Sequence, residues 1–145
     1  MQESPVLTIR TSTASLSAAH ALIEAALSAS SAAGVEIAVA VVDAGGNLKA
    51  FSRSDSAPFL TVEASINKAW TAASFGLPTH VWNEYLADSK LAPLASLPRL
   101  LAVGGGCPIR IDGVLVGAIG VSGGSYDQDQ AFAEAALASV GFNQF

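Results

Sequence analysis

The sequence predicts an α+β domain, an antiparallel sheet of about five strands with helices packed on its faces. Two segments have the turn chemistry of β-hairpins, Asp43 to Asn47 and Asp112-Gly113, and each lies between short apolar runs. Longer segments repeat apolar residues at the spacing of an amphipathic helix. Helices with one apolar stripe must bury it against another element, so hairpins and helices together favour one layered structure. The length suits a single domain over residues 1–145.

The first half of the chain is predicted to hold two helices among three strands. In order, these are a strand at 6–10, a helix at 15–33, strands at 35–42 and 48–53, and a helix at 58–75. The first helix repeats Leu16, His20, Ile23 and Leu27 at helical spacing, which predicts its buried stripe. Gly34 is expected to end this helix.

The strand at 35–42 is apolar on both faces. Alternate residues are bulky on one face, where Ile37 and Val39 lie, and small on the other, where Ala38 and Ala40 lie. A flat face of this kind suits either a closely packed helix or a flat ligand.

The second half is predicted to continue with a short helix, three strands and a final helix. The ranges are 78–88 for the helix, 99–103, 107–111 and 114–122 for the strands, and 125–140 for the last helix. Ser125 and Gln128 have the spacing of a capping box, which predicts where the last helix begins.

Composition limits the classes of partner. Only 13% of the residues are charged, against roughly 25% in an average domain, while 51% are hydrophobic. So few charges predict that part of the surface is buried in a homo-oligomer. The net charge of −5, without a Lys/Arg cluster, argues against nucleic acid.

The sequence also bears on membranes and on the cellular compartment. No run of 18 apolar residues predicts a membrane span, and the start of the chain lacks the apolar core of a signal peptide. Cys107 is the one cysteine, which excludes an internal disulfide. A cytoplasmic location is therefore expected.

Two glycine-rich corners at the ends of neighbouring strands form the first candidate site. They are Gly104-Gly105-Gly106 and Ser122-Gly123-Gly124. Without a Cβ, such residues either make tight turns or let a ligand approach the backbone. The second corner also fits the G-x-S-x-G pattern of a nucleophile elbow. Both histidines precede Ser122, opposite to the order in that class of hydrolase, so the pattern favours a turn.

Lys68 and Thr71 lie one turn apart on the same face of the helix at 58–75. A lysine shielded by apolar neighbours could act as a base or nucleophile, or bind a ligand carboxylate. It could equally extend along the helix edge toward solvent. Asp43 and Asp129 are the candidate acid or base partners.

The histidines and the cysteine are candidate ligands of a haem iron. His20 falls on the predicted apolar stripe, so it is either a buried structural histidine or an axial ligand, and His80 lies in a loop. Cys107 is an axial thiolate, a reactive thiol or a small core residue. Arg53, at a strand end, could bind a carboxylate of the same ligand.

Four motifs, in order, resemble one known family. They are Val41-Val42-Asp43 with Gly45-Gly46, Asn67-Lys68-Ala69-Trp70-Thr71 with Phe75-Gly76-Leu77-Pro78, Gly105-Gly106-Cys107-Pro108, and the run from Val116 to Gly124 followed by Asp129. Together they cover residues 15–140 and resemble the GlcG/HbpS-like family, which includes the C-terminal domain of PduO-type proteins.

This resemblance implies a profilin-like α-β-α sandwich, assembly into homo-oligomers that are often octamers, and binding of haem or a related tetrapyrrole. The positions that match the family motifs are Asp43, Lys68, Thr71, Gly105, Gly106, Ser122, Gly123 and Asp129. Cys107 departs from the pattern, because members more often have a small aliphatic residue there.

Two hypotheses on function follow. In the first, the protein is a small homo-oligomeric binder of haem or a related tetrapyrrole. The flat sheet face and the glycine corners, with Gly124, would receive the ring, Lys68 or Arg53 would meet a propionate, and His20 or His80 would be the axial ligand. In the second, it is an enzyme on a small carboxylated or hydroxylated metabolite. Lys68 would orient or deprotonate the substrate, and the amides of Gly105, Gly106 and Gly123 would stabilise negative charge.

Overall fold

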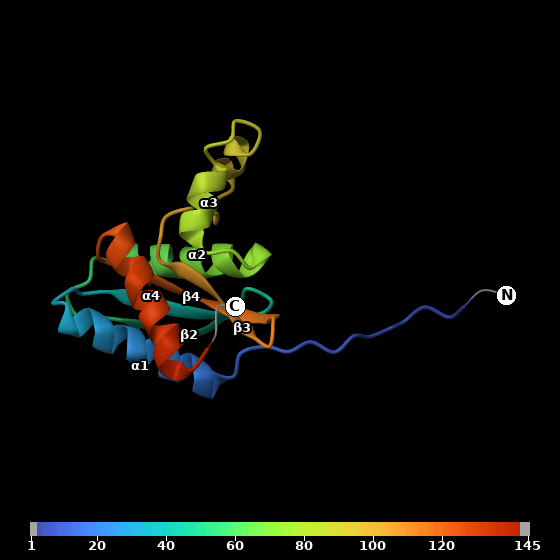
Figure 1. Cartoon of the computed structure of the whole chain (residues 1–145), viewed down its shortest axis with the longest axis horizontal. Helices are drawn as coiled ribbons and strands as arrows, with labels where there is room; N and C mark the ends of the chain where they lie inside the picture. The colour runs from blue at the N-terminus through green and yellow to red at the C-terminus, as the bar shows by residue number, and fades with distance from the viewer. Residues whose placement is uncertain (1–2, 143–145) are drawn as a thin grey trace.

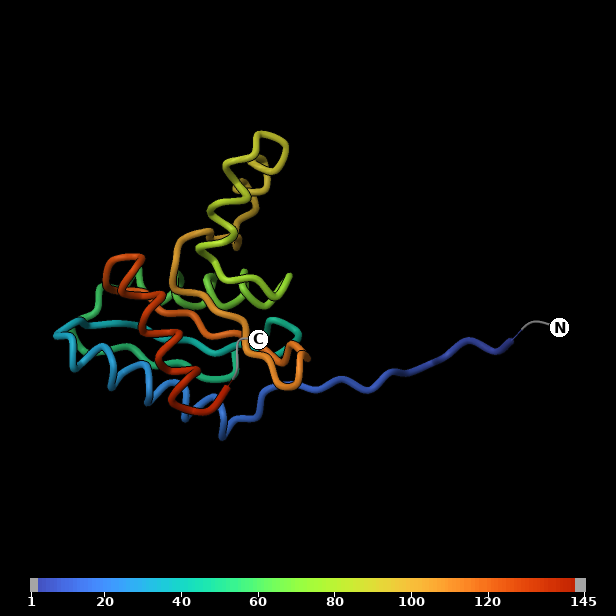
Figure 2. Tube along the Cα trace, in the orientation of Figure 1, coloured from blue at the N-terminus to red at the C-terminus, as the bar shows by residue number. Residues whose placement is uncertain are grey.

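The structure is a computed structural model that describes residues 3–142 of the chain. Its elements are α1 (Leu16–Ala32), β1 (Ala38–Asp43), β2 (Leu48–Arg53), α2 (Leu60–Phe75), α3 (Thr79–Tyr85), the 3-10 helix η1 (Ala92–Ser96), β3 (Gly106–Ile111), β4 (Val114–Ser122) and α4 (Tyr126–Val140). Figure 1 shows the sheet between α2 on one side and α1 and α4 on the other. Figure 2 traces the same path along the chain. The α+β class and the layering match the prediction.

The sheet is antiparallel throughout, with four strands in the order β2-β1-β4-β3. Both hairpins form where the turn chemistry predicted them. At the second turn, Asp112 and Gly113 have positive φ values of 51° and 79°, as a tight two-residue hairpin requires. The Ser125–Gln128 capping box is present at the start of α4. These features depend on neighbouring residues, which explains why the sequence predicts them well.

The prediction of about five strands was wrong because two predicted strands do not pair with the sheet. Residues 6–10 are extended but have no β partner, and residues 99–103 form a loop. In that loop, Thr71 Oγ1 accepts a hydrogen bond from the Leu101 amide (3.0 Å) and donates one to the Arg99 carbonyl (3.2 Å). A threonine side chain on α2 thus takes the role that a neighbouring strand would have had.

The bulky and flat faces of β1 meet different layers. Ile37, Val39 and Val41 pack into the large core under α1 and α4. On the flat face, Val42 packs with three alanines of α2. A Cβ at Gly120, on the neighbouring strand, would collide with the backbone of α2 at Ser65 and Ala69. The flat face is therefore covered by a closely packed helix, and the expectation that a tetrapyrrole ring lies there was wrong.

The predicted stripe of α1 is buried only in its second half, where Ile23 is 5% exposed and Leu27 packs against the large core. Leu16 is 51% exposed and His20 is exposed, whereas Ala19, Leu22 and Ala26 are fully buried. Small alanines let the helix approach the sheet and α4 closely, so here closeness of packing outweighs side-chain size.

Two segments extend away from this body. α3 and η1 project from the α2 side of the sheet, and the N-terminal residues leave one side of the body, near the start of α1, as an extended arm (Figure 1). Among the described residues, no helix is both long and apolar enough to cross a membrane.

Candidate functional site

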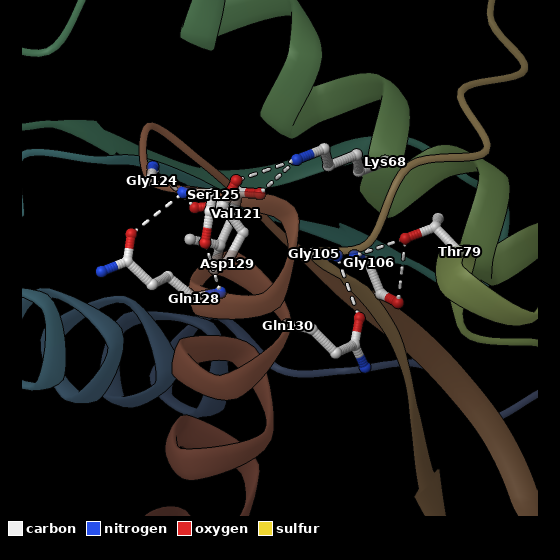
Figure 3. A network of polar contacts seen from close by, with 10 residues as sticks. All are labelled: Lys68, Thr79, Gly105, Gly106, Val121, Gly124, Ser125, Gln128, Asp129 and Gln130. Carbon is white, nitrogen blue, oxygen red and sulfur yellow. Dashed lines mark hydrogen bonds and ion pairs between the residues drawn. The ribbon is translucent and has the colours of Figure 1, made fainter. Parts of the chain in front are cut away.

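The two glycine corners meet at the end of β4, where α2, α3 and α4 also converge. Figure 3 shows Lys68 reaching from α2 past the end of β4 toward Asp129 in the first turn of α4. It also shows Thr79 and Gln130 pointing at the backbone of Gly106 and Gly105. The structure therefore brings together most of the site residues predicted from the corners.

Lys68 and Asp129 form a buried ion pair, with 3.1 Å between Nζ and Oδ2. Each side chain is 3% exposed. Lys68 Nζ also donates a hydrogen bond to the Val121 carbonyl at 3.0 Å. Burial lowers the pKa of Lys68 from its ordinary value of 10.5, and the charge and hydrogen bond of Asp129 oppose that shift. The amine is thus held between two internal acceptors, one on the sheet and one on α4.

Three backbone amides of the glycine corners donate to side chains of the same molecule. These hydrogen bonds run from Gly105 to Gln130 Oε1 (2.9 Å), from Gly106 to Thr79 Oγ1 (2.8 Å) and from Gly124 to Asp129 Oδ1 (2.8 Å). An oxyanion needs donors that point into an open site. These three amides instead donate to acceptors within the same molecule, so they do not point into an open site.

Glycine is required at the corners because backbone and side chains approach too closely for a Cβ. Gly105 has φ +132° and Gly123 has φ +142°, which L side chains rarely adopt. A Cβ at Gly105 would meet the Val121 carbonyl and come within 2.9 Å of Lys68 Nζ. The glycines therefore make room for the ion pair. Of the two roles weighed for them, tight turns or ligand approach, these contacts favour the turns.

Cys107 behaves as a core residue. Its side chain is 1% exposed and packs in the large core. Burial raises the pKa of the thiol to about 12, and the charge of Glu134 acts in the same direction, while a hydrogen bond from Gln130 Nε2 (3.0 Å) opposes them. A thiol with so high a pKa is a poor nucleophile and a poor thiolate ligand.

Asp43 and Arg53 have local partners, and they lie at opposite ends of the sheet: Asp43 pairs with Gly117, whereas Arg53 is level with Ser122 across β1. Asp43 Oδ1 accepts hydrogen bonds from the Gly45 and Asn47 amides, both at 3.0 Å, and so closes the β1–β2 turn. Arg53 is exposed and donates to the Ala57 carbonyl at 2.9 Å. Ser122 is 7% exposed at the end of β4, opposite Ala38 of β1.

An open cleft beside Gly104 lies between α3 and α4, with a volume of about 640 Å³. We call it the His80 cleft. Its lining includes His80, Glu84, Val103, Tyr126, Asp127 and Glu134. Gln130 also lines it and connects it to Gly105 and Cys107. Such a volume is in the usual range for small-molecule sites, roughly 300–1,000 Å³.

The sequence identified His80 and Gly104 as candidates but not the other residues of this cleft. Gln130 and Glu134 are four residues apart on α4, and Gln130 Nε2 donates to Glu134 Oε1 at 3.0 Å. This spacing indicates only that both lie on one helical face. His20 lies on the exposed face of α1 and does not line the His80 cleft. Within residues 3–142, no three His, Cys, Asp or Glu side chains group as they would around a metal ion.

The fold and this site define a small α+β domain with a four-stranded antiparallel sheet between helices, a closed ion-pair corner and a cleft bearing one imidazole. The family model described as haem degrading protein HbpS-like matches residues 15–138, and the chain belongs to that family. It is also 34% identical, over 128 residues, to a 15.0 kDa protein from the dhaT-dhaS intergenic region of Citrobacter freundii. That match covers 86% of this chain and 90% of the relative.

Solved structures support the same family assignment. A double mutant of HbpS from Streptomyces reticuli has a TM-score of 0.86 and 32% identity, and the match covers 97% of this chain and 99% of that chain. A crystal structure of a PduOC:heme complex has a TM-score of 0.83 and 28% identity, covering 91% of this chain and 98% of that chain. The expected family is therefore confirmed.

Proposed function

We propose that this protein binds haem or a related tetrapyrrole in the His80 cleft, with His80 as the axial ligand. The observation that carries the proposal is the exposed imidazole of His80 on the wall of a cleft of about 640 Å³. A structural relative is described as a haem complex, and the matched family is named for haem degradation. One strong axial ligand is enough to hold haem iron.

The residues of the cleft fit the ring better than they fit its carboxylates. Val103, 40% exposed, and Tyr126, 63% exposed, offer apolar surface beside His80. Glu84, Asp127 and Glu134 line the same cleft, whereas the basic candidates Lys68 and Arg53 do not. Carboxylates repel propionates at close range, so the ring would enter with its propionates toward solvent. Haem would supply the redox and ligand-binding chemistry of its iron, and the chain would supply an axial nitrogen and a partly apolar wall.

Two matched variants test this assignment. Both histidines are exposed, so replacing either leaves the core intact. A haemin titration should give a shifted Soret band saturating near one haem per chain or per dimer in the wild type and in His20→Ala. The same titration should give a broad, unshifted absorbance in His80→Ala. Equal saturable Soret shifts in both variants would remove His80 from the site. Nonsaturable absorbance in the wild type would refute haem binding itself.

The contacts of Lys68, Gly105 and Gly106 do not favour the hypothesis of an enzyme on a small carboxylated or hydroxylated metabolite. Lys68 is 3% exposed and paired, and the amides of Gly105 and Gly106 already donate to side chains. It stays a prediction, and binding of a small carboxylate that is lost in Lys68→Met while the fold is retained would support it.

We further propose that the working form is a homo-oligomer, built from dimers toward a tetramer or octamer, in the cytoplasm. Large apolar side chains such as Phe59 (87% exposed), Leu60 (70%) and Phe75 (73%) lie on the surface of the single chain. Oligomers commonly cover surfaces of this kind. Light scattering across a dilution series measures the assembly directly.

A further inference from the structure

The N-terminal arm is an extended segment that its own chain leaves uncovered. Residues 3–12 are all exposed, and Figures 1 and 2 show them running away from the body. The arm carries Val6, Leu7 and Ile9, which are 85%, 87% and 81% exposed. In an extended strand alternate side chains share a face, so Leu7 and Ile9 form one apolar face.

The root of the arm is fixed to one end of the sheet. The Ala14 amide donates to the Val116 carbonyl of β4 at 2.9 Å, and Thr13 Oγ1 accepts from the Ala44 amide of the first hairpin turn at 2.9 Å. Ala14 is 3% exposed. The arm therefore leaves the molecule from the end where the hairpin turns lie.

That same end carries exposed apolar side chains. Asp43 of β1 pairs with Gly117 near the start of β4, and Ile111 pairs with Val114, so both hairpin turns lie at one end of the sheet. The C-terminus of α2 lies there too, because Arg110 donates to the Gly76 carbonyl at 2.8 Å. The exposed apolar residues are Leu48 (52%), Phe75 (73%), Ile111 (49%) and Val114 (51%). These side chains are spread across that end of the sheet, from β2 to the β3–β4 hairpin, and we call them the hairpin-end patch.

The arm is poorly suited to covering this patch within its own chain. To do so it would have to reverse direction close to its root. The residues from Val6 to Thr13 include no Gly, Pro, Asn or Asp, and Ser12 is the one residue among them of a type that tight turns favour. Eight extended residues span about 26 Å, which suits reaching across a neighbouring molecule.

We infer that the arm of each chain lies over the hairpin-end patch of a second copy, with Leu7 and Ile9 facing the patch. Root and patch share one end, so a two-fold axis near that end lets both arms exchange at once and the assembly closes. Arg10 of the arm and exposed Asp112, between Ile111 and Val114, have complementary charges. This inference rests on the proposed homo-oligomer and adds the element that holds two copies together.

Point variants on the arm test the inference without touching the core. Ile9→Asp and Leu7→Asp should shift the mass measured by light scattering toward smaller species, with the circular dichroism of the folded chain retained. Thr8→Asp, on the opposite face of the same arm, is the matched control and should leave the mass unchanged. A wild-type mass retained in both Ile9→Asp and Leu7→Asp would overturn the arm exchange while leaving the homo-oligomer intact. A monomeric wild type would overturn both.

A cross-link between differently tagged chains decides whether the arm acts within or between copies. One chain carries Ile9→Cys and the other carries Val114→Cys, and buried Cys107 stays out of the reaction. After coexpression and mild oxidation we expect a disulfide joining the two tags. A Phe59→Cys chain, altered at the far end of α2, should give no such product with the Ile9→Cys chain. A disulfide found only within a chain carrying both Ile9→Cys and Val114→Cys would refute exchange.

Discussion

The Lys68–Asp129 ion pair gives the sharpest test of the closed corner. Replacing Lys68 with Met keeps most of the side-chain length but removes the charge. Asp129 then remains 3% exposed, with a hydrogen bond from Gly124 and no cation beside it. Removing one partner of a buried pair typically costs about 3–5 kcal/mol. A small domain has a free energy of unfolding of about 5–15 kcal/mol, so Lys68→Met should lose a large part of it.

Urea unfolding followed by tryptophan fluorescence, at one fixed protein concentration, measures this loss. The double variant Lys68→Met with Asp129→Leu should lose less than the sum of the two single changes, because it leaves no buried charge unpaired. A loss below about 1 kcal/mol in Lys68→Met, the range of surface pairs, would refute our account of the corner.

The pH dependence of Asp129→Asn supplies a second readout of the same pair. Burial lowers the pKa of Lys68 in the folded state, and Asp129 is the group that raises it. Without that carboxylate, the folded variant binds fewer protons than the unfolded chain, so its stability increases as pH rises toward 10.5. The deficit relative to wild type should therefore shrink between pH 7 and pH 10. A deficit that does not change with pH would contradict the assignment.

Two further predictions concern Cys107 and Gly120. Burial raises the pKa of the Cys107 thiol from 9.0 in the unfolded chain to about 12 in the folded one. Above pH 9 the unfolded chain is therefore stabilised by ionisation, and wild type should lose stability relative to Cys107→Ala. At pH 10.5 the loss of stability amounts to about 2 kcal/mol, which urea unfolding at a series of pH values can measure. Parallel pH profiles of the two proteins would refute the prediction. Gly120→Ala places a methyl group against the backbone of α2 and should cost about 1–3 kcal/mol or more. In thermal melts Gly45→Ala, which meets only side-chain atoms of its own turn, should change the midpoint far less.

Local chemistry accounts for what the sequence predicts well. The hairpin at Asp112-Gly113 and the capping box at Ser125 are each specified by residues within four positions, and both form as expected. The predicted strand at 99–103 failed because its backbone bonds to Thr71, which is about 30 residues earlier in the chain. No local pattern encodes such a partner.

In the candidate site too, local patterns pointed to single residues but not to the distant residues they contact. Lys68 and Asp129 were each singled out, yet they are 61 residues apart and their contact depends on how α2 and α4 pass the end of β4. The His80 cleft depends on the angle at which α3 leaves the body, which spacing does not specify. The stripe predicted for α1 was right at Ile23 and Leu27. It was wrong at Leu16 and His20, because α1 is rich in alanine and side-chain size was a weak guide to its buried face.

The closed glycine corner has a consequence for how the protein opens. A run such as Gly104 to Gly106 would ordinarily exchange its amide hydrogens with solvent within moments. Here the Gly105, Gly106 and Gly124 amides donate to side chains of two helices, α3 and α4, and Lys68 of α2 lies beside them. Their deuterium uptake should therefore be slow and should follow that of the central strands. Layers on both sides of the sheet would then separate in one cooperative step, with the most glycine-rich segment among the last to become labelled.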